Sequence, residues 1–307
     1  MACQHSSYLT FTIFCNLVKL VTFYELKPIQ LGCEVHSIDL GNPLPENVIE
    51  TIKKDVTEHR ILIFKNQRNI SPDKHVEIGR WFGELESTSF YKHPKSPSLN
   101  IFRVSNDASE GQVGVGNTGW HIDGQYLQKP CSYSIYHMVN ISRGAETLFA
   151  PLNDIIEGLS HRQRHRWERL WVVRNPHGTD VIHPLIYSHP ESGKKVLCLH
   201  TGLTGAFYWD RGNVNQRLTN MKETQALKKE IDHVFTKDKH TVQYSHKWEP
   251  GDFIISDNLA LAHVAPPSSQ RRRSEVGLRV LHRVTVAGKE SPTKKYDLSQ
   301  LKQKKEL

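Results

Sequence analysis

Long apolar runs and paired cysteines are both missing from this 307-residue sequence. No stretch approaches the ~18 consecutive apolar residues that a membrane-spanning helix needs, so no membrane partner is expected. The five cysteines are odd in number, lie far apart and form no CxxC pair (Cys3, Cys15, Cys33, Cys131 and Cys198). Neither a disulfide framework nor a thiolate zinc site is indicated, and a reducing compartment, the cytoplasm, is expected.

Internal repeats and low-complexity segments are missing too, and the composition of 37% hydrophobic and 23% charged residues is that of an ordinary globular protein. The formal charge of +8 would suit nucleic acid, an acidic membrane surface or a small acid. The densest basic stretch, HRQRHRWER at 161–169, lacks the aromatic or glycine pattern of nucleic-acid-binding modules. We interpret it as a solvated face and expect no nucleic-acid partner, and the composition is compatible with a homo-oligomer.

The two ends of the chain differ from its middle. Residues 1–22 are apolar in patches, but Asn16 and Lys19 interrupt them and no basic leader region precedes them, which predicts an N-terminal extension. Residues 289–307 form a polar, Lys-rich tail. No linker interrupts residues 23–288, so one domain is predicted there.

The first part of that domain alternates strand and helix patterns. Strands are predicted at 21–26, 32–40 and 60–67, the last containing the continuous apolar run ILIF of a buried strand. Helices are predicted at 43–59, which Pro45 opens, and at 71–85, where Ser71 is a candidate N-cap ahead of Pro72.

Beyond residue 95, short strands are separated by Gly, Asn, Asp and Pro, which is typical of an antiparallel sandwich. Two helices are predicted among them, at 154–173 and 219–235. The pattern therefore predicts a mostly β fold with flanking helices, either a sandwich or a jelly roll. The candidate strands are 99–105, 132–139, 146–151, 196–200, 241–248, 252–258 and 278–288.

The motif GWHIDGQY at 119–126 carries the sharpest chemical signal. A strand would turn His121 and Asp123 to the same face, so an imidazole and a carboxylate could reach one point. A distant histidine, His263, would complete a two-histidine, one-carboxylate triad, which leaves coordination positions open for substrate and oxygen on Fe(II). Two alternatives stay open: the triplet can arise by chance among 18 histidines, and His263 can be a core histidine bonded to backbone.

Arg279 follows His263 on the next strand pattern. If buried, its planar guanidinium would pair with a carboxylate through two hydrogen bonds, which a lysine could not copy. Arg283 lies four residues further on and so on the same strand face. Both arginines can also be ordinary surface residues.

These motifs, in this order, resemble the TauD/TfdA family of Fe(II)/2-oxoglutarate dioxygenases, which includes the taurine dioxygenases. The likeness runs from about residue 30 to residue 288. The segments that carry it are GCEVHSIDLGNPL, HRILIFKNQRNISPDKHVEIGRWFGEL, GWHIDGQY, SRGAETLFAP, HPLIYSHPESGKK, WEPGDFIISDN and LRVLHRV. The resemblance implies a double-stranded β-helix, or jelly roll, that uses Fe(II), 2-oxoglutarate and O2.

The resemblance also implies roles for single residues, by matching this chain to the motifs of the family. The metal ligands would be His121, Asp123 and His263, the far carboxylate of 2-oxoglutarate would contact Arg279 and Thr147, and the substrate pocket would include Asn117, Tyr91 and Arg283. Taurine dioxygenases place a substrate-binding histidine where this chain has Thr88, which puts taurine in doubt as the substrate.

The function predicted is oxidation, by default hydroxylation, of a small and anionic organic molecule with release of succinate and CO2. Three alternatives remain open: a desaturase or cyclase of the same family in specialised metabolism, a non-catalytic metal-binding jelly roll, and an enzyme that oxidises nucleic-acid bases. A binder without catalysis would have no use for Arg279 or Thr147.

Overall fold

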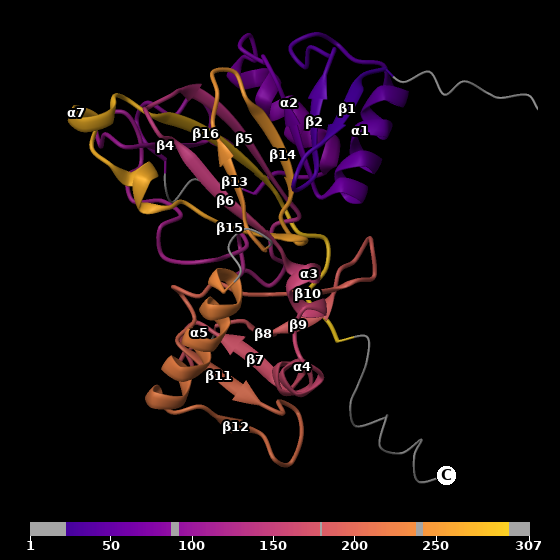
Figure 1. Ribbon diagram of the computed structural model, residues 1–307, viewed down its shortest axis with the longest axis vertical. Helices are drawn as coiled ribbons and strands as arrows, with labels where there is room; N and C mark the ends of the chain where they lie inside the picture. Colours follow the sequence, from indigo (N-terminus) through magenta and orange to yellow (C-terminus); the bar gives the residue numbers. More distant parts are fainter. Residues whose placement is uncertain (1–22, 87–91, 179, 238–241, 295–307) are drawn as a thin grey trace, which may run out of the picture.

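The computed structural model describes residues 23–86, 92–178, 180–237 and 242–294. Figure 1 shows two parts: a body of β-sheets flanked by α1 and α2, and a second lobe that contains α4, α5 and β7. The predictions for residues 1–22, Thr88 and Tyr91, and for most of the Lys-rich tail, lie outside the described residues.

The body contains a seven-stranded sheet that faces a three-stranded one, and all neighbouring strands are antiparallel except β2 and β3. The inner faces pack together through one apolar cluster to which both sheets contribute, including Ile254 and Leu281 from one and Phe149 and Leu261 from the other. This arrangement confirms the predicted jelly roll. In spatial order the larger sheet is β1 (Glu25–Pro28), β2 (Cys33–His36), β3 (Ile61–Phe64), β14 (Phe253–Asp257), β5 (Tyr133–Asn140), β16 (Val280–Val286) and β4 (Phe102–Ser105); the smaller is β13 (Tyr244–Lys247), β6 (Glu146–Pro151) and β15 (Leu261–Val264).

Two helices, α1 (Glu46–His59) and α2 (Pro72–Phe82), cover the outer face of the large sheet. Their apolar stripes pack on the outward side chains of β3, which explains why ILIF is buried along its whole length. Both helices confirm the sequence predictions, and the Ser71 hydroxyl accepts the backbone N–H of Lys74 as an N-cap should.

The second lobe lies between β6 and β13 in sequence. Its sheet has the order β12–β11–β7–β8, beside a separate hairpin of β9 and β10. Its elements are α3 (Leu152–Glu157), α4 (His161–Glu168), β7 (Leu170–Val173), β8 (Ile182–Pro184), β9 (Ile186–Ser188), β10 (Lys195–Leu197), β11 (Ala206–Trp209), β12 (Arg217–Leu218) and α5 (Met221–Thr236). Two short helical pieces, η2 (Pro267–Gln270) and α7 (Arg273–Val276), follow β15.

The single helix predicted over 154–173 is wrong. The chain ends α3 at Gly158, begins α4 after the cap Ser160, and then enters strand β7. The Ser160 hydroxyl accepts the N–H of Gln163, so a capping residue in the middle of the predicted helix is the signal that was missed.

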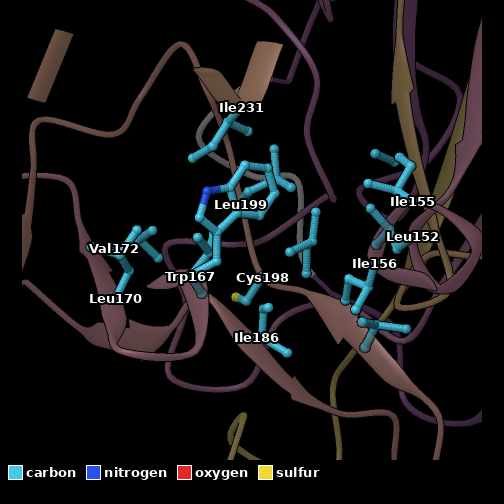
Figure 2. Packing of buried hydrophobic residues seen from close by; sticks show 14 of the residues in the cluster. Leu152, Ile155, Ile156, Trp167, Leu170, Val172, Ile186, Cys198, Leu199 and Ile231 are labelled. Carbon is cyan, nitrogen blue, oxygen red and sulfur yellow. The ribbon is translucent and has the colours of Figure 1, made fainter. Parts of the chain in front are cut away.

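The core of the second lobe reaches the body of the protein. Figure 2 shows Trp167 surrounded by aliphatic side chains that include Leu199 and Ile231. The same cluster contains Trp120 and Ile122, the neighbours of His121, and Ala262, the neighbour of His263. The apolar packing of the lobe therefore fixes the backbone that carries the candidate ligands.

Candidate active site

The strand predicted around His121 is not a regular strand. His121 forms only isolated bridges, to His263 on one side and His200 on the other, and Gly119 and Gly124 have φ values of 114° and 70° that interrupt extended backbone. The alternation of side chains survives over this short stretch because Trp120 and Ile122 are buried in the apolar core. His121 and Asp123 consequently share the opposite face, as the motif predicted.

His121, Asp123 and His263 are brought together although 140 residues separate the last two. The backbones of His121 and His263 exchange two hydrogen bonds, of 3.2 and 2.9 Å, and one potential ligand atom from each of the three side chains lies within 4.8 Å of the others. Two ligand atoms that bind one ion at about 2.1 Å lie at most ~4.2 Å apart. The 3.7 Å between His263 Nε2 and Asp123 Oδ2 meets this condition already.

Both imidazoles are in the neutral form that metal binding requires. Burial, with the neighbouring His263 as the next cause, lowers the pKa of His121 to about 3, and burial lowers the pKa of His263 to about 4. His121 Nδ1 donates to the carbonyl of Gly119 at 2.8 Å, so its Nε2 lone pair is left for an ion.

The Asp123 carboxylate is ionised and oriented. Burial opposes ionisation, but Arg283 and the two imidazoles outweigh it and hold the pKa of Asp123 well below its usual range. Arg283 donates to Oδ1 at 2.7 Å and Ser134 to Oδ2 at 2.5 Å. The Asn258 side chain fixes the backbone of Asp123 by accepting its N–H at 2.8 Å and donating to its carbonyl at 3.0 Å.

Arg279 is a buried cation for which the described residues supply no counter-ion. It is 3% exposed, no carboxylate of the described residues forms an ion pair with it, and its Nε has no hydrogen-bond partner. Burial alone lowers the pKa of Arg279 to about 10, so it remains charged at neutral pH. A buried charge of this kind is costly unless a ligand neutralises it.

Thr147 lies on β6, two residues before Phe149 and so on the same strand face. The ring of Phe149 packs against that of His263, with centroids 6.2 Å apart. The Thr147 hydroxyl accepts the indole N–H of Trp248 at 3.0 Å, which leaves its own proton for another acceptor.

A cavity of about 360 Å³ opens onto His121 and Asp123. Its walls combine apolar groups such as Leu127 and Leu203 with the charged Arg283, which also lies 4.9 Å from the ring of Phe102. Asn117 is exposed on the adjacent glycine-rich loop, and its neighbours Gly116 and Thr118 line the cavity instead. The pocket roles given to Asn117 and Tyr91 stay predictions.

Four polar residues of this site were not identified from the sequence. Ser134 and Tyr136 alternate along β5 and face the same side as the candidate ligands, Asn258 supports Asp123, and the His200 ring stacks on His121 with centroids 4.7 Å apart. Strand β5 gave no clear signal for Ser134 and Tyr136, because Tyr133 and His137 on the same strand are also polar and bond groups outside the site.

The family model "Taurine catabolism dioxygenase TauD, TfdA family" matches residues 24–285. An alpha-ketoglutarate-dependent sulfonate dioxygenase of Saccharomyces cerevisiae is 28% identical over 77% of this chain, which spans 60% of that protein's length. A pentalenolactone F synthase of Streptomyces arenae is 22% identical, with 78% of this chain and 89% of the relative covered. The solved structure of a taurine dioxygenase from Burkholderia xenovorans superposes with a TM-score of 0.70 at 25% identity and covers 87% and 90% of the two chains.

Among the helices of the described residues, none combines the length and apolar character needed to cross a bilayer. The cytoplasmic location, the lack of a nucleic-acid partner and the compatibility with a homo-oligomer stay predictions.

Proposed function

We propose, because the chain belongs to the TauD and TfdA family of taurine catabolism dioxygenases, that it uses Fe(II), 2-oxoglutarate and O2 to oxidise a small anionic organic molecule. The observation that carries the proposal is that the same chain has both a three-residue metal site and a buried arginine, Arg279, whose charge the described residues do not neutralise. A protein that only held a metal ion would gain nothing from an arginine that costs folding free energy.

His121, Asp123 and His263 would hold the iron. Two imidazole nitrogens and one carboxylate oxygen are the donor set of Fe(II) oxygenases and leave positions open for exogenous ligands. An ion held through Oδ2 of Asp123, the oxygen near His263 Nε2, would leave Arg283 on Oδ1, and the other N–H groups of Arg283 would be available to another anion. The bound iron, together with 2-oxoglutarate, supplies the oxidative chemistry that yields succinate and CO2.

Arg279 and Thr147 would bind the far carboxylate of 2-oxoglutarate. The guanidinium offers a planar fork, and the neutralisation of its buried charge supplies part of the binding free energy. Thr147 adds a hydroxyl whose position is fixed by Trp248.

The substrate would lie in the 360 Å³ cavity with its anionic group toward Arg283 and its carbon skeleton along the apolar wall. The sulfonate dioxygenase relative supports an anionic substrate. We propose hydroxylation as the default outcome. A desaturation or ring closure is the alternative, since either would start from the same oxidative chemistry.

Anaerobic titration of the Fe(II)-loaded protein with 2-oxoglutarate tests the proposal. The wild type should develop a weak visible charge-transfer band, and His263→Ala should not. His137→Ala is the matched control, because His137 is also a buried histidine but bonds the carbonyl of Gln67 away from the site. A wild type without the band, or a band that survives in His263→Ala, contradicts the proposal.

A panel of alkyl sulfonates, alkyl sulfates, phenoxy acids and neutral or cationic analogues, followed by succinate release, tests the substrate class. Turnover confined to the neutral and cationic compounds would contradict the anionic substrate but leave the metal chemistry intact.

A further inference from the structure

Tyr136 places a phenol hydroxyl beside the proposed iron. It lies on β5, the strand between β14 and β16 in the large sheet, and is 4% exposed. Its hydroxyl is 3.3 Å from His263 Nε2, the nitrogen that also approaches Asp123. That nitrogen has one lone pair, so the phenol and a metal ion compete for it.

The ring of Tyr136 packs among aromatic side chains near Thr147, one of the residues assigned to the far carboxylate of 2-oxoglutarate. Its centroid lies 6.4 Å from the rings of both Phe149 and Trp248, and Trp248 is the residue that fixes the Thr147 hydroxyl. On the neighbouring strand, Arg283 is the register partner of Tyr136. The phenol is therefore next to His263, and its ring lies near Trp248, the hydrogen-bond partner of Thr147.

Metal binding would leave the phenol proton in need of another acceptor. Ser134 is an alternative acceptor, because it is within hydrogen-bond reach of the Tyr136 hydroxyl and its own proton is donated to Asp123, so that its oxygen can still accept. A hydrogen bond to a carboxylate is about twice as strong as one between neutral groups. The phenol would therefore donate its hydrogen bond to a carboxylate that entered next to His263, and not to the Ser134 hydroxyl.

We propose that Tyr136 donates a hydrogen bond to the metal-bound carboxylate of 2-oxoglutarate and is a co-substrate-positioning residue of this site. The inference rests on the proposed function and deepens it. It assigns the two ends of the co-substrate to different side chains: Tyr136 to the near end, and Arg279 with Thr147 to the far end.

Tyr136→Phe removes one oxygen and retains the ring that packs on Phe149 and Trp248. The matched control is Tyr133→Phe on the same strand, since the Tyr133 hydroxyl interacts with Thr57 of α1, outside the site. Thermal unfolding of both variants verifies that they are folded. Three quantities are then measured. Mn(II) affinity comes from the electron paramagnetic resonance of the free ion, 2-oxoglutarate affinity from the anaerobic Fe(II) charge-transfer titration, and oxalate affinity from its competition with 2-oxoglutarate for that band.

The expected result is a 2-oxoglutarate Kd raised roughly 10- to 100-fold in Tyr136→Phe, as for the loss of one hydrogen bond to a charged group. Mn(II) affinity should stay equal or rise, because the phenol no longer competes for His263. Oxalate, which has no far carboxylate arm, should lose affinity in Tyr136→Phe by a similar factor. Tyr133→Phe should match the wild type in all three.

An unchanged 2-oxoglutarate Kd in Tyr136→Phe overturns the inference. So does a fall in Mn(II) affinity, since it would mean that the phenol only orients His263. An unchanged oxalate affinity also overturns it, because the phenol would then serve the far end. If the wild type itself gives no charge-transfer band, it is the proposed function that fails.

Discussion

Arg279 carries a buried charge that the described residues of the ligand-free protein do not neutralise. Its guanidinium is buried, unpaired among the described residues and charged at neutral pH. By contrast Arg103, which is also largely buried, donates to the backbone and side chain of Glu110 and to His282. The fold supplies hydrogen-bond acceptors to Arg103, whereas it leaves the guanidinium of Arg279 for an anion.

Arg279→Met should therefore stabilise the ligand-free protein while it weakens co-substrate binding. Removal of an uncompensated buried charge should raise the free energy of unfolding by about 1–3 kcal/mol, and the 2-oxoglutarate Kd should increase at least ~100-fold, as for a lost bidentate ion pair. Urea unfolding and the charge-transfer titration measure the two effects. Arg103→Met, the matched control, should lose stability; a destabilised Arg279→Met with normal 2-oxoglutarate affinity would contradict the assignment.

Arg283 should act on the substrate and not on the co-substrate. In Arg283→Met we expect KM for an anionic substrate from the panel to rise roughly 10- to 100-fold, the cost of one charge-assisted hydrogen bond. The 2-oxoglutarate Kd should change little, because Arg279 is intact. Steady-state kinetics in which each compound is varied separately give both values. If Arg283→Met weakened only the binding of 2-oxoglutarate, Arg283 would be a co-substrate residue and the prediction would be wrong.

At the level of elements, the short stretch from Gly119 to Asp123 depends on side-chain packing more than on strand hydrogen bonds. Trp120 stacks on Phe235 of α5, with centroids 5.0 Å apart and planes 16° from parallel. Ile122 is fully buried in the same cluster. The second lobe thus holds the ligand-bearing segment in place, although it contributes none of the three candidate ligands itself.

Trp120→Ala should therefore weaken both folding and metal binding. The lost packing should cost about 3–5 kcal/mol of stability, and Mn(II) affinity should fall because His121 and Asp123 lose their fixed backbone. Trp171→Ala is the matched control: Trp171 lies on β7 of the same lobe and is only partly buried, so Mn(II) affinity should be retained. Equal losses of Mn(II) affinity in the two variants would rule out this supporting role.

Elements with a long periodic pattern or a clear cap were predicted well from the sequence, and α1, α2, α5, β3 and β5 are examples. The strands of the second lobe were mostly missed, since β8 and β9 have three residues each and no alternation can be recognised in so short a stretch. The strand predicted at 196–200 overlaps only the end of β10. The break between α3 and α4 depends on one capping serine. These short elements are set by tertiary packing on Trp167 and its neighbours, which a local pattern does not contain.

The residues of the candidate site also fall into two groups, those that a local sequence motif identifies and those that only the fold brings to the site. The motif around His121 and its spacing from Asp123 pointed to one metal centre, and the structure brings His263 to it. Tyr136 and Asn258 belong to ordinary strand and turn sequences, and their importance arises only because the fold places them beside Asp123 and His263. Residues that act through a contact across the sheet leave no signature in the sequence.

Across the whole molecule, histidines outside the site make stability depend on pH. Burial lowers the pKa of His75, His137 and His282, the last to about 3, and His75 and His137 are 6.1 Å apart. In the unfolded chain these histidines bind protons below their ordinary pKa of about 6.5. In the folded protein they stay neutral until a lower pH. The stabilisation is complete above pH ~6.5 and is lost as the pH falls toward the folded values.

The free energy of unfolding of the metal-free protein should thus fall below pH 6.5, by up to about 1.4 kcal/mol per pH unit for each such histidine. Urea titrations between pH 7.5 and 5 measure the slope. His75→Phe should make it shallower, whereas His161→Ala, at the exposed start of α4, should leave it unchanged. A slope that is identical in all three proteins would show that the buried histidines do not control it.

The proposed function requires a metal ion and a dicarboxylate to share one site. The most direct measurement is a crystal structure with Mn(II) and N-oxalylglycine, a metal and an analogue that do not turn over. We predict an anomalous peak among His121, Asp123 and His263, with the far carboxylate of the analogue on the Arg279 guanidinium. A peak elsewhere, or an analogue that leaves Arg279 without a partner, would contradict the account.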